Sequence, residues 1–217
     1  MKKLLLLCFF SCFCLAEPVN VLFFGDSNTL GTKADLNSTH DENKTFAGIV
    51  RSGLKGKASV EINAKNGRTI ALDIPNAEYN GIKALRSHIK ENKSDIAVIM
   101  LGTNDLALGA APQPMIAYFS TIISDLKKAG TRKILIIAPP HLEPSYLAER
   151  DKKGISTNSK VFNGELQKLA YQRNAKFLNA AKIIDKAHES DEVHMSLEDH
   201  KSLAAAILPL INELLSE

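Results

Sequence analysis

The 217-residue sequence has no tryptophan, only 6% aromatic residues and just three cysteines. So few aromatic side chains argue against the stacking platforms on which proteins bind bases or sugars. The net positive charge is also small, at +3 with no clustered basic excess, so no nucleic-acid groove is expected. Neither repeats nor low-complexity linkers occur, which excludes collagen-like, coiled-coil and disordered chains. The length suits one domain with one sizeable core.

The N-terminal segment Met1–Ala16 has the pattern of a secretory signal and contains all three cysteines. Lys2 and Lys3 supply the positive start, and residues 4–15 form an apolar run that is too short to span a bilayer as an ordinary helix. Removal of this leader would leave residues 17–217 as one domain without a thiol, so neither a disulfide nor a thiolate site is expected. The sequence therefore predicts a periplasmic or secreted protein that is not inserted in a membrane; a lipid anchor on Cys12 is the alternative.

The rest of the chain alternates short apolar runs with stretches of helical period. Five runs predict strands: Val19–Phe24, Ser59–Ile62, Ile96–Leu101, Lys133–Ala138 and Lys176–Leu178. Between them, apolar residues recur at helical spacing, for example at Met115, Phe119, Ile122 and Leu126. This alternation predicts a single α/β domain, a three-layer α/β/α sandwich around a five-stranded parallel sheet. Pro209 is expected to interrupt and kink the last helix.

Polar residues follow several of the predicted strands. Such sheets bind ligands beyond the carboxyl ends of their strands, so the segments 25–29, 63–69, 102–105 and 191–194 are expected to share one rim. Ser27, in a sharp turn beside Gly25, offers a hydroxyl that needs a base before it can act as a nucleophile. His194 is a base suited to neutral pH, and Asp191, three residues before it, can orient the ring.

Negative charge that develops on a carbonyl oxygen needs hydrogen-bond donors. The backbone N–H groups of Ser27 and Gly67 and the side-chain amide of Asn104 are available on the same rim. Together these groups predict acyl transfer through a serine nucleophile. No grouping of His, Asp and Glu has metal-ligand spacing, so no metal is expected.

These blocks carry a family resemblance. Gly-Asp-Ser near the N-terminus, an isolated Gly, Gly-x-Asn-Asp and a late Asp-x-x-His resemble, in order and spacing, the SGNH (GDSL) hydrolases over about residues 19–215. The runs GRT, IMLGTND and IIAPP resemble the arylesterase/acetylesterase branch, which includes oligomers, so a homo-oligomer is an open expectation.

The resemblance implies a flavodoxin-like fold and ester hydrolysis without a cofactor. It assigns Ser27 as nucleophile, His194 and Asp191 as its partners, and Gly67 and Asn104 as oxyanion donors. Asn28 stands where that family commonly has leucine, which is expected to alter the acyl pocket. Four residues are expected to contact substrate: Asn28, Arg68, Thr103 and His141.

Other histidines and two loops complete the expectations. His141, just after the fourth predicted strand, is the rival base, although no carboxylate stands near it at a spacing like that of Asp191. His188 and His200 flank the Asp-x-x-His block and are expected to be solvated. Loops over residues 31–43 and 141–158 are expected to shape the pocket.

The expected activity is hydrolysis of small acyl esters, acetyl above all, of carbohydrate or aryl alcohols, the substrate being a small ester or an acylated glycan. Lysophospholipid or acyl thioester hydrolysis on the same fold is an alternative. A flavodoxin-like FMN-binding protein is a candidate from another class, because residues 23–29 faintly resemble a phosphate loop. A non-catalytic protein that binds acylated glycans is a third. The colour of the purified protein and its turnover of p-nitrophenyl acetate would separate these.

Overall fold

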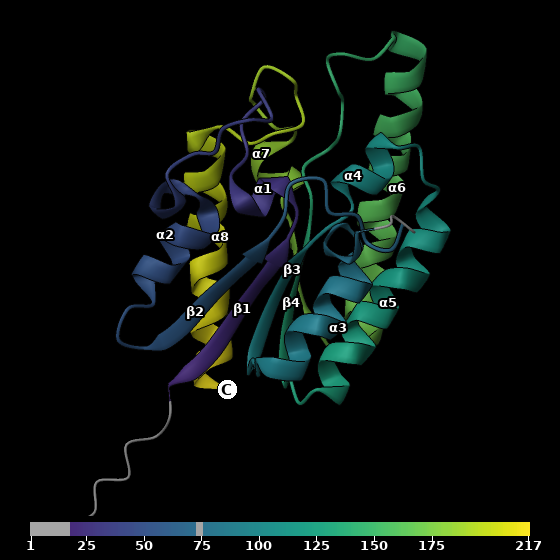
Figure 1. Cartoon of the computed structure of the whole chain (residues 1–217). Helices are drawn as coiled ribbons and strands as arrows, with labels where there is room; N and C mark the ends of the chain where they lie inside the picture. Colours follow the sequence, from purple (N-terminus) through teal and green to yellow (C-terminus); the bar gives the residue numbers. More distant parts are fainter. Residues whose placement is uncertain (1–17, 73–75) are drawn as a thin grey trace, which may run out of the picture.

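Five parallel strands form the centre of the molecule (Figure 1). They run in the order β2-β1-β3-β4-β5, which confirms the predicted five-stranded parallel sheet. Their bounds lie close to the apolar runs of the sequence: β1 Val19–Gly25, β2 Ala58–Ala64, β3 Ile96–Met100, β4 Lys133–Ala138 and β5 Lys176–Asn179.

This computed structural model describes residues 18–72 and 76–217. The signal expected at Met1–Ala16, with its cysteines, therefore lies outside the described residues. Within the described ranges, no helix is both long and apolar enough to cross a bilayer.

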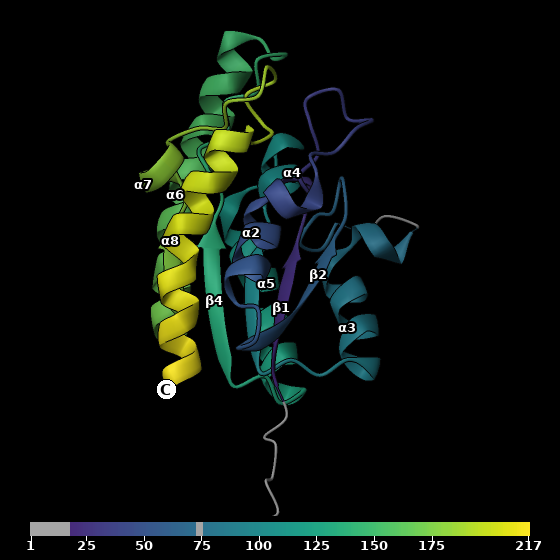
Figure 2. The same cartoon turned by 90° about the vertical axis from the view of Figure 1, so that its left-hand side faces the viewer.

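Helices cover both faces of the sheet and make the three layers that the sequence predicts (Figures 1 and 2). One face packs against α3 Gly81–Glu91, α5 Pro112–Lys128 and α6 Glu149–Gln172. The other packs against α2 Phe46–Gly53, α7 Ala181–Ile184 and α8 Leu197–Ser216. The described residues also form four short elements: α1 Ser27–Leu30, η1 Glu42–Lys44, η2 Ala77–Tyr79 and α4 Thr103–Ala107.

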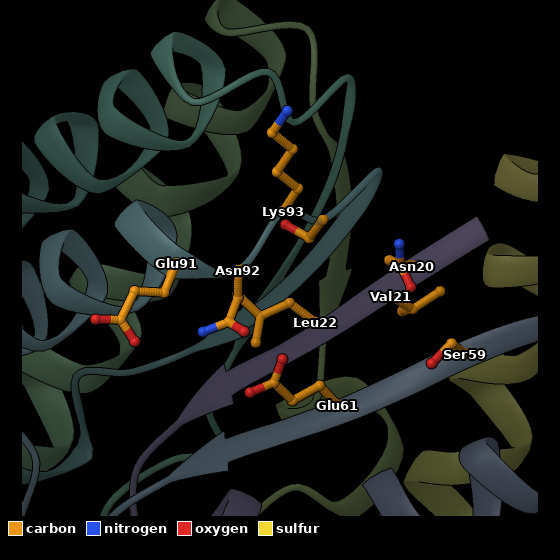
Figure 3. A pocket seen from close by; sticks show the side chains of 9 residues that line it. Asn20, Val21, Leu22, Ser59, Glu61, Glu91, Asn92 and Lys93 are labelled. Carbon is orange, nitrogen blue, oxygen red and sulfur yellow. The ribbon is translucent and has the colours of Figure 1, made fainter. Parts of the chain in front are cut away.

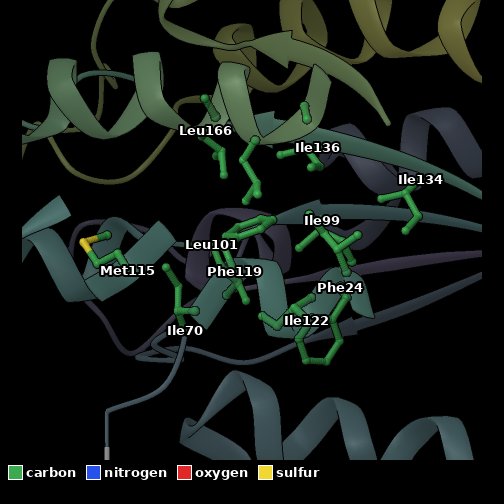
Figure 4. Packing of buried hydrophobic residues seen from close by; sticks show 14 of the residues in the cluster. Phe24, Ile70, Ile99, Leu101, Met115, Phe119, Ile122, Ile134, Ile136 and Leu166 are labelled. Atoms are coloured by element: carbon green, nitrogen blue, oxygen red, sulfur yellow. The ribbon is translucent and has the colours of Figure 1, made fainter. Parts of the chain in front are cut away.

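The apolar runs form strands because their alternate side chains enter two separate cores. In β1, Leu22 and Phe24 join the α3/α5/α6 core, whereas Val21 and Phe23 join the α2/α8 core. Phe24, Ile99, Phe119 and Leu166 lie together in the first of these (Figure 4). The central strands are therefore buried on both faces. Burial of each such side chain contributes about 1.5–3 kcal/mol to the stability of the fold.

Two expectations about helices are wrong in detail. The segment 141–158 is a loop only as far as residue 148, because α6 begins at Glu149. Its inward face continues from Phe162 back through Ser159 and Ile155, and the polar Ser159 hides the helical period in the sequence. Pro209 does not interrupt the last helix, since α8 continues through it to Ser216.

Candidate active site

The direction of the strand order reverses beside β1. The chain leaves β1 toward β2 on one side and leaves β3 toward β4 on the other, so the order reverses between β1 and β3. Gly25, at the end of β1, is in register with Ala64 of β2 and with Met100 of β3. The polar segments that follow these three strands therefore start side by side, as the sequence predicts.

The turn after β1 places Ser27 at the start of α1. A Cβ on Gly25 would collide with the Thr29 side chain and lie 2.9 Å from the Met100 carbonyl oxygen, so the turn requires glycine. Asp26 caps α1 by accepting a hydrogen bond from the Asn28 N–H at 3.0 Å. Ser27 is only 1% exposed, so its side chain is recessed below the protein surface.

Arg68 holds the polar segment after β2, residues 63–69, in place through hydrogen bonds to backbone carbonyls. It was expected on the rim as a substrate contact, but its side chain is 1% exposed and lies over the Phe24 ring, 4.4 Å from the centroid. Its guanidinium donates to backbone carbonyls of Gly25 at 3.1 Å, Asn63 at 2.9 Å and Glu78 at 3.0 Å. Burial lowers the pKa of Arg68 to about 10, so it is still charged at neutral pH. Arg68 therefore fastens the Gly67 turn to the end of β1.

The third segment is bonded directly to that turn. Asn104 Nδ2 donates to the Arg68 carbonyl oxygen at 2.9 Å, which brings the Asn104 amide next to Gly67. An amide nitrogen carries two hydrogens, so one remains for a ligand. Gly67 itself has φ +77°, which favours glycine. Two of the three oxyanion donors expected from the sequence, Gly67 and Asn104, are thus neighbours.

Asp105 braces the same loop. Its two carboxylate oxygens accept from the Ile70 N–H at 3.1 and 2.9 Å. Asp105 is only 3% exposed, and burial raises its pKa to about 6. Its contacts are all consistent with a structural role beside Asn104.

His194 and Asp191 form a compact pair on the loop before α8. His194 Nδ1 donates to Asp191 Oδ2 at 2.6 Å, and Asp191 Oδ1 accepts from the backbone N–H groups of Val193 and His194, both at 3.0 Å. Burial alone would raise the pKa of Asp191, but the hydrogen bonds from His194 outweigh it and lower that pKa. The carboxylate is therefore ionised and fixes both the backbone and the ring of His194.

The β1 turn and the His194 loop touch through Asn28. Asn28 was expected to contact substrate and to shape the acyl pocket, but its side chain is 1% exposed and bonds to the main chain of Val193 and Met195. Burial raises the pKa of Asp26 to about 6, while the charge of His194 acts to lower it, so these two groups interact. Ser27 stands between Asp26 and Asn28 in the chain, so its turn is held against the His194 loop.

Thr103 and His141 lie differently from what the sequence suggests. Thr103 is 3% exposed, and its side chain lies close enough to Asp26 to act on the pKa of that carboxyl, which it lowers. His141 does have a carboxylate partner, because its Nδ1 lies 3.3 Å from Asp185 Oδ1. Sequence reasoning missed Asp185 since it is 44 residues away, directly after α7. That pair is looser than His194–Asp191, and the Asp185 side chain is 85% exposed.

His200 is not solvated, contrary to expectation. It is fully buried, stacks on Phe46 with ring centroids 5.9 Å apart, and its Nδ1 accepts from the Phe46 N–H at 3.2 Å. Burial lowers its pKa to about 4. His188 is exposed, as expected, and pairs with Asp199 at 2.6 Å.

A polar groove adjoins the His194 loop. It has a volume of about 710 Å³, and its walls include Lys153 and Lys160 of α6 together with Lys186 and Glu192 of the loop that carries Asp191. The segment after β4 is bonded to the same loop, because the Ser145 N–H donates to the Asp191 carbonyl oxygen at 3.0 Å. The groove is therefore lined by Glu192, the residue that follows Asp191 in the chain.

A second hollow, of about 430 Å³, lies elsewhere. Asn20, Ser59 and Glu61 line it at the amino-terminal ends of β1 and β2, the end of the sheet opposite Ser27 (Figure 3). It is no part of the candidate active site. Across residues 18–72 and 76–217, no group of three or more His, Cys, Asp or Glu side chains is arranged to hold a metal ion.

Comparisons with known proteins agree with this arrangement. The model of the GDSL-like lipase/acylhydrolase family matches residues 23–201, whereas a search of curated proteins finds no match. A solved carbohydrate acetylesterase from Sinorhizobium meliloti is 25% identical, with a TM-score of 0.80, and the match covers 90% of this chain and 99% of that one. The native aryl esterase of M. smegmatis is 23% identical with the same TM-score and the same coverage, and shares the fold. The chain therefore belongs to the GDSL-like lipase/acylhydrolase family and is an esterase or acylhydrolase of that family.

Proposed function

We propose that the protein is a serine esterase that removes small acyl groups, acetyl above all, from carbohydrate or aryl alcohols through an acyl-enzyme intermediate. The observation that carries the proposal is the 2.6 Å His194–Asp191 pair, whose loop is bonded to the residue that follows Ser27. This contact supports a triad in which the Ser27 hydroxyl, the His194 imidazole and the ionised Asp191 carboxylate act together at the switch point of the sheet.

The proposed reaction has two steps. Ser27 Oγ bonds to the ester carbonyl carbon while its proton moves to His194 Nε2, and Asp191 stabilises the imidazolium that forms. The bond from that carbon to the alcohol oxygen then breaks, and the alcohol takes the proton from Nε2. In the second step a water gives its proton to Nε2 and attacks the acyl-enzyme. The acid then leaves as Ser27 recovers its proton.

The oxyanion of each tetrahedral intermediate needs donors that are already in place. The backbone N–H groups of Ser27 and Gly67 and the second Asn104 N–H are the proposed donors. The Asn104–Arg68 bond supports this set, because it holds the amide beside Gly67 before any substrate arrives.

Two features support a small acyl group on a polar alcohol. Ser27 and Thr103 are 1% and 3% exposed, which leaves little open space for a long chain at the nucleophile. The groove beside Asp191 is lined by charged and hydroxyl side chains, which suit a sugar better than a lipid tail. Export through the proposed leader would bring the enzyme to extracellular or envelope glycans.

Replacement of Ser27 by alanine tests the mechanism. We expect it to abolish turnover of p-nitrophenyl acetate and covalent labelling by an organophosphonate; labelling that persists would identify another nucleophile. A chain-length series of p-nitrophenyl esters, together with acetylated xylan, a lysophospholipid and an acyl thioester, tests the substrate class. A maximum at acetyl supports the proposal, whereas a preference for long acyl chains supports a lysophospholipase or thioesterase. A yellow, inactive preparation would support FMN binding instead.

A further inference from the structure

Asn28 joins the two halves of the proposed active site. It follows Ser27 in α1, and its side-chain amide makes two hydrogen bonds to residues more than 160 positions away. Asn28 Nδ2 donates to the Val193 carbonyl oxygen at 3.1 Å, and Asn28 Oδ1 accepts from the Met195 N–H at 3.0 Å. The residue between those two backbone groups is His194.

The chemistry of these two bonds requires asparagine. One bond needs a donor and the other an acceptor, and a primary amide offers both in one plane. The side chain is 1% exposed, so water does not substitute easily for either bond. Leucine has nearly the same shape but neither polar group, and a carboxylate lacks the donor.

Other contacts hold the same loop but do not lead to Ser27. Asp191 binds the ring and the N–H of His194 from within the loop. The Glu189 N–H donates to the His194 carbonyl oxygen at 3.0 Å, and His40 Nε2 lies 3.2 Å from that of Met195. These bonds shape the loop, whereas the two bonds of Asn28 fix the backbone on both sides of His194 to the turn that presents Ser27.

We propose that Asn28 is a positioning residue that sets the place of His194 relative to Ser27. The inference rests on the proposed roles of these two residues. Because a base displaced by about 1 Å can cost about 100-fold in rate, loss of the two bonds should act on the chemical step and not on substrate binding.

The first test replaces Asn28 by leucine and uses Asn163→Leu as the matched control. Asn163 is also buried, at 2% exposure, and its Nδ2 donates to a backbone carbonyl, that of Pro139, at 2.9 Å. With p-nitrophenyl acetate, we expect kcat of N28L to fall about 100-fold with KM within about threefold of wild type. N163L should lose thermal stability but keep kcat. Equal loss of kcat in both variants, or an unchanged kcat in N28L, would overturn the proposal.

A second readout does not depend on activity. In the wild type the Met195 N–H is buried and bonded to Asn28, so its hydrogen exchange should be slow; N28L should accelerate exchange there but not at amides in the middle of β3. If Ser27→Ala is inactive but N28L has wild-type kcat and exchange, Asn28 has no positioning role and the serine mechanism stands. If Ser27→Ala retains full activity, the serine mechanism and the positioning role both fail.

Asn28→Asp adds a pH-dependent test. A carboxylate can accept from the Met195 N–H but repels the Val193 carbonyl, whereas the protonated acid donates to it and restores both bonds. The activity of N28D relative to wild type should therefore rise as pH falls from about 8 to about 5.5. Asp26, Asp191, His40 and His194 lie nearby, but all four are present in both proteins, so they cancel in the ratio. The variant N28A, which has no group to protonate, should give a flat ratio. A flat ratio for N28D would contradict the proposal.

Discussion

Two histidine–aspartate pairs of equal length lie within a few residues of each other. His194 Nδ1 is 2.6 Å from Asp191, and His188 Nδ1 is 2.6 Å from Asp199. In each pair the aspartate also accepts the backbone N–H of its own histidine, at 3.0 Å. By distance and hydrogen bonding alone, the two pairs cannot be told apart.

Their surroundings differ. The His194 side chain is 5% exposed and interacts with Asp26, next to Ser27, whereas the His188 side chain is 57% exposed. Asp199 has another task, since it forms the capping box of α8 with Ser196. A short His–Asp contact therefore marks a candidate base only where the ring is buried and its loop is bonded to the turn that carries a candidate nucleophile.

The largest expected effect comes from removing each histidine in turn. Because a general base contributes up to about 10⁴-fold, His194→Ala should lower kcat/KM for p-nitrophenyl acetate by about 10³–10⁴-fold. His188→Ala should leave it unchanged, since its ring lies in solvent. Steady-state kinetics at neutral pH would check both. A large loss in H188A, with H194A active, would reverse the assignment of the two pairs.

Replacement of Asp191 should affect activity, whereas replacement of Asp199 should affect stability. Asp191→Asn should lower kcat by about 10³-fold, because the amide no longer stabilises the imidazolium. Asp199→Asn should keep most activity but lose about 0.5–2 kcal/mol of unfolding free energy with the capping box of α8. Urea denaturation and kinetics on the same samples make the measurement. An inactive, fully stable D199N would contradict the structural role of Asp199.

Loss of a hydrogen-bond donor that transfers no proton should lower kcat less than loss of the general base. Asn104→Ala should lower kcat by about 10²–10³-fold with little change in KM, because the bond to the oxyanion strengthens in the transition state. Asn92→Ala is a suitable control, since that side chain caps the end of α3 at the other end of the sheet. An equal loss of kcat in N92A would show that the effect of N104A is not local.

The fold and the main candidate residues could be predicted from local patterns. Apolar runs gave the five strands because both faces of a central parallel strand are buried, and the positions of Ser27, Asn104 and His194 after strands or before a helix indicated one rim. The start of α6 was hidden, because Ser159 occupies an inward position that the helical pattern reserves for an apolar side chain.

What could not be predicted depends on partners far away in the chain. Nothing near Arg68 in the sequence indicates that its guanidinium would be buried against the carbonyls of Gly25 and Glu78. The partner of His141, Asp185, comes from another loop. Asn28 offered one signal, a polar residue where the related family commonly has leucine, but the two backbone groups that it binds are visible only in three dimensions.

The smallest expected effect is a pH-dependent change in the stability of the protein that is caused by a third histidine, His200. This residue lies on α8, directly after Asp199. Its pKa is lowered from 6.5 to about 4 by burial, so between these values the unfolded chain binds a proton that the folded chain does not. Wild type should therefore lose about 2 kcal/mol relative to His200→Asn as pH falls from about 7.5 to about 5, since each pKa unit is worth about 1.4 kcal/mol. Asparagine can still accept from the Phe46 N–H.

The difference between the two proteins is the quantity to measure, not the curve of wild type alone. Asp26 and Asp105 have pKa values raised to about 6, so their protonation favours the folded state as pH falls and opposes the effect of His200. Both carboxyls are present in wild type and in H200N, and their contributions cancel in the difference. A constant difference between wild type and H200N across this range would mean that His200 is not held neutral by burial, and that its contact with Phe46 survives protonation.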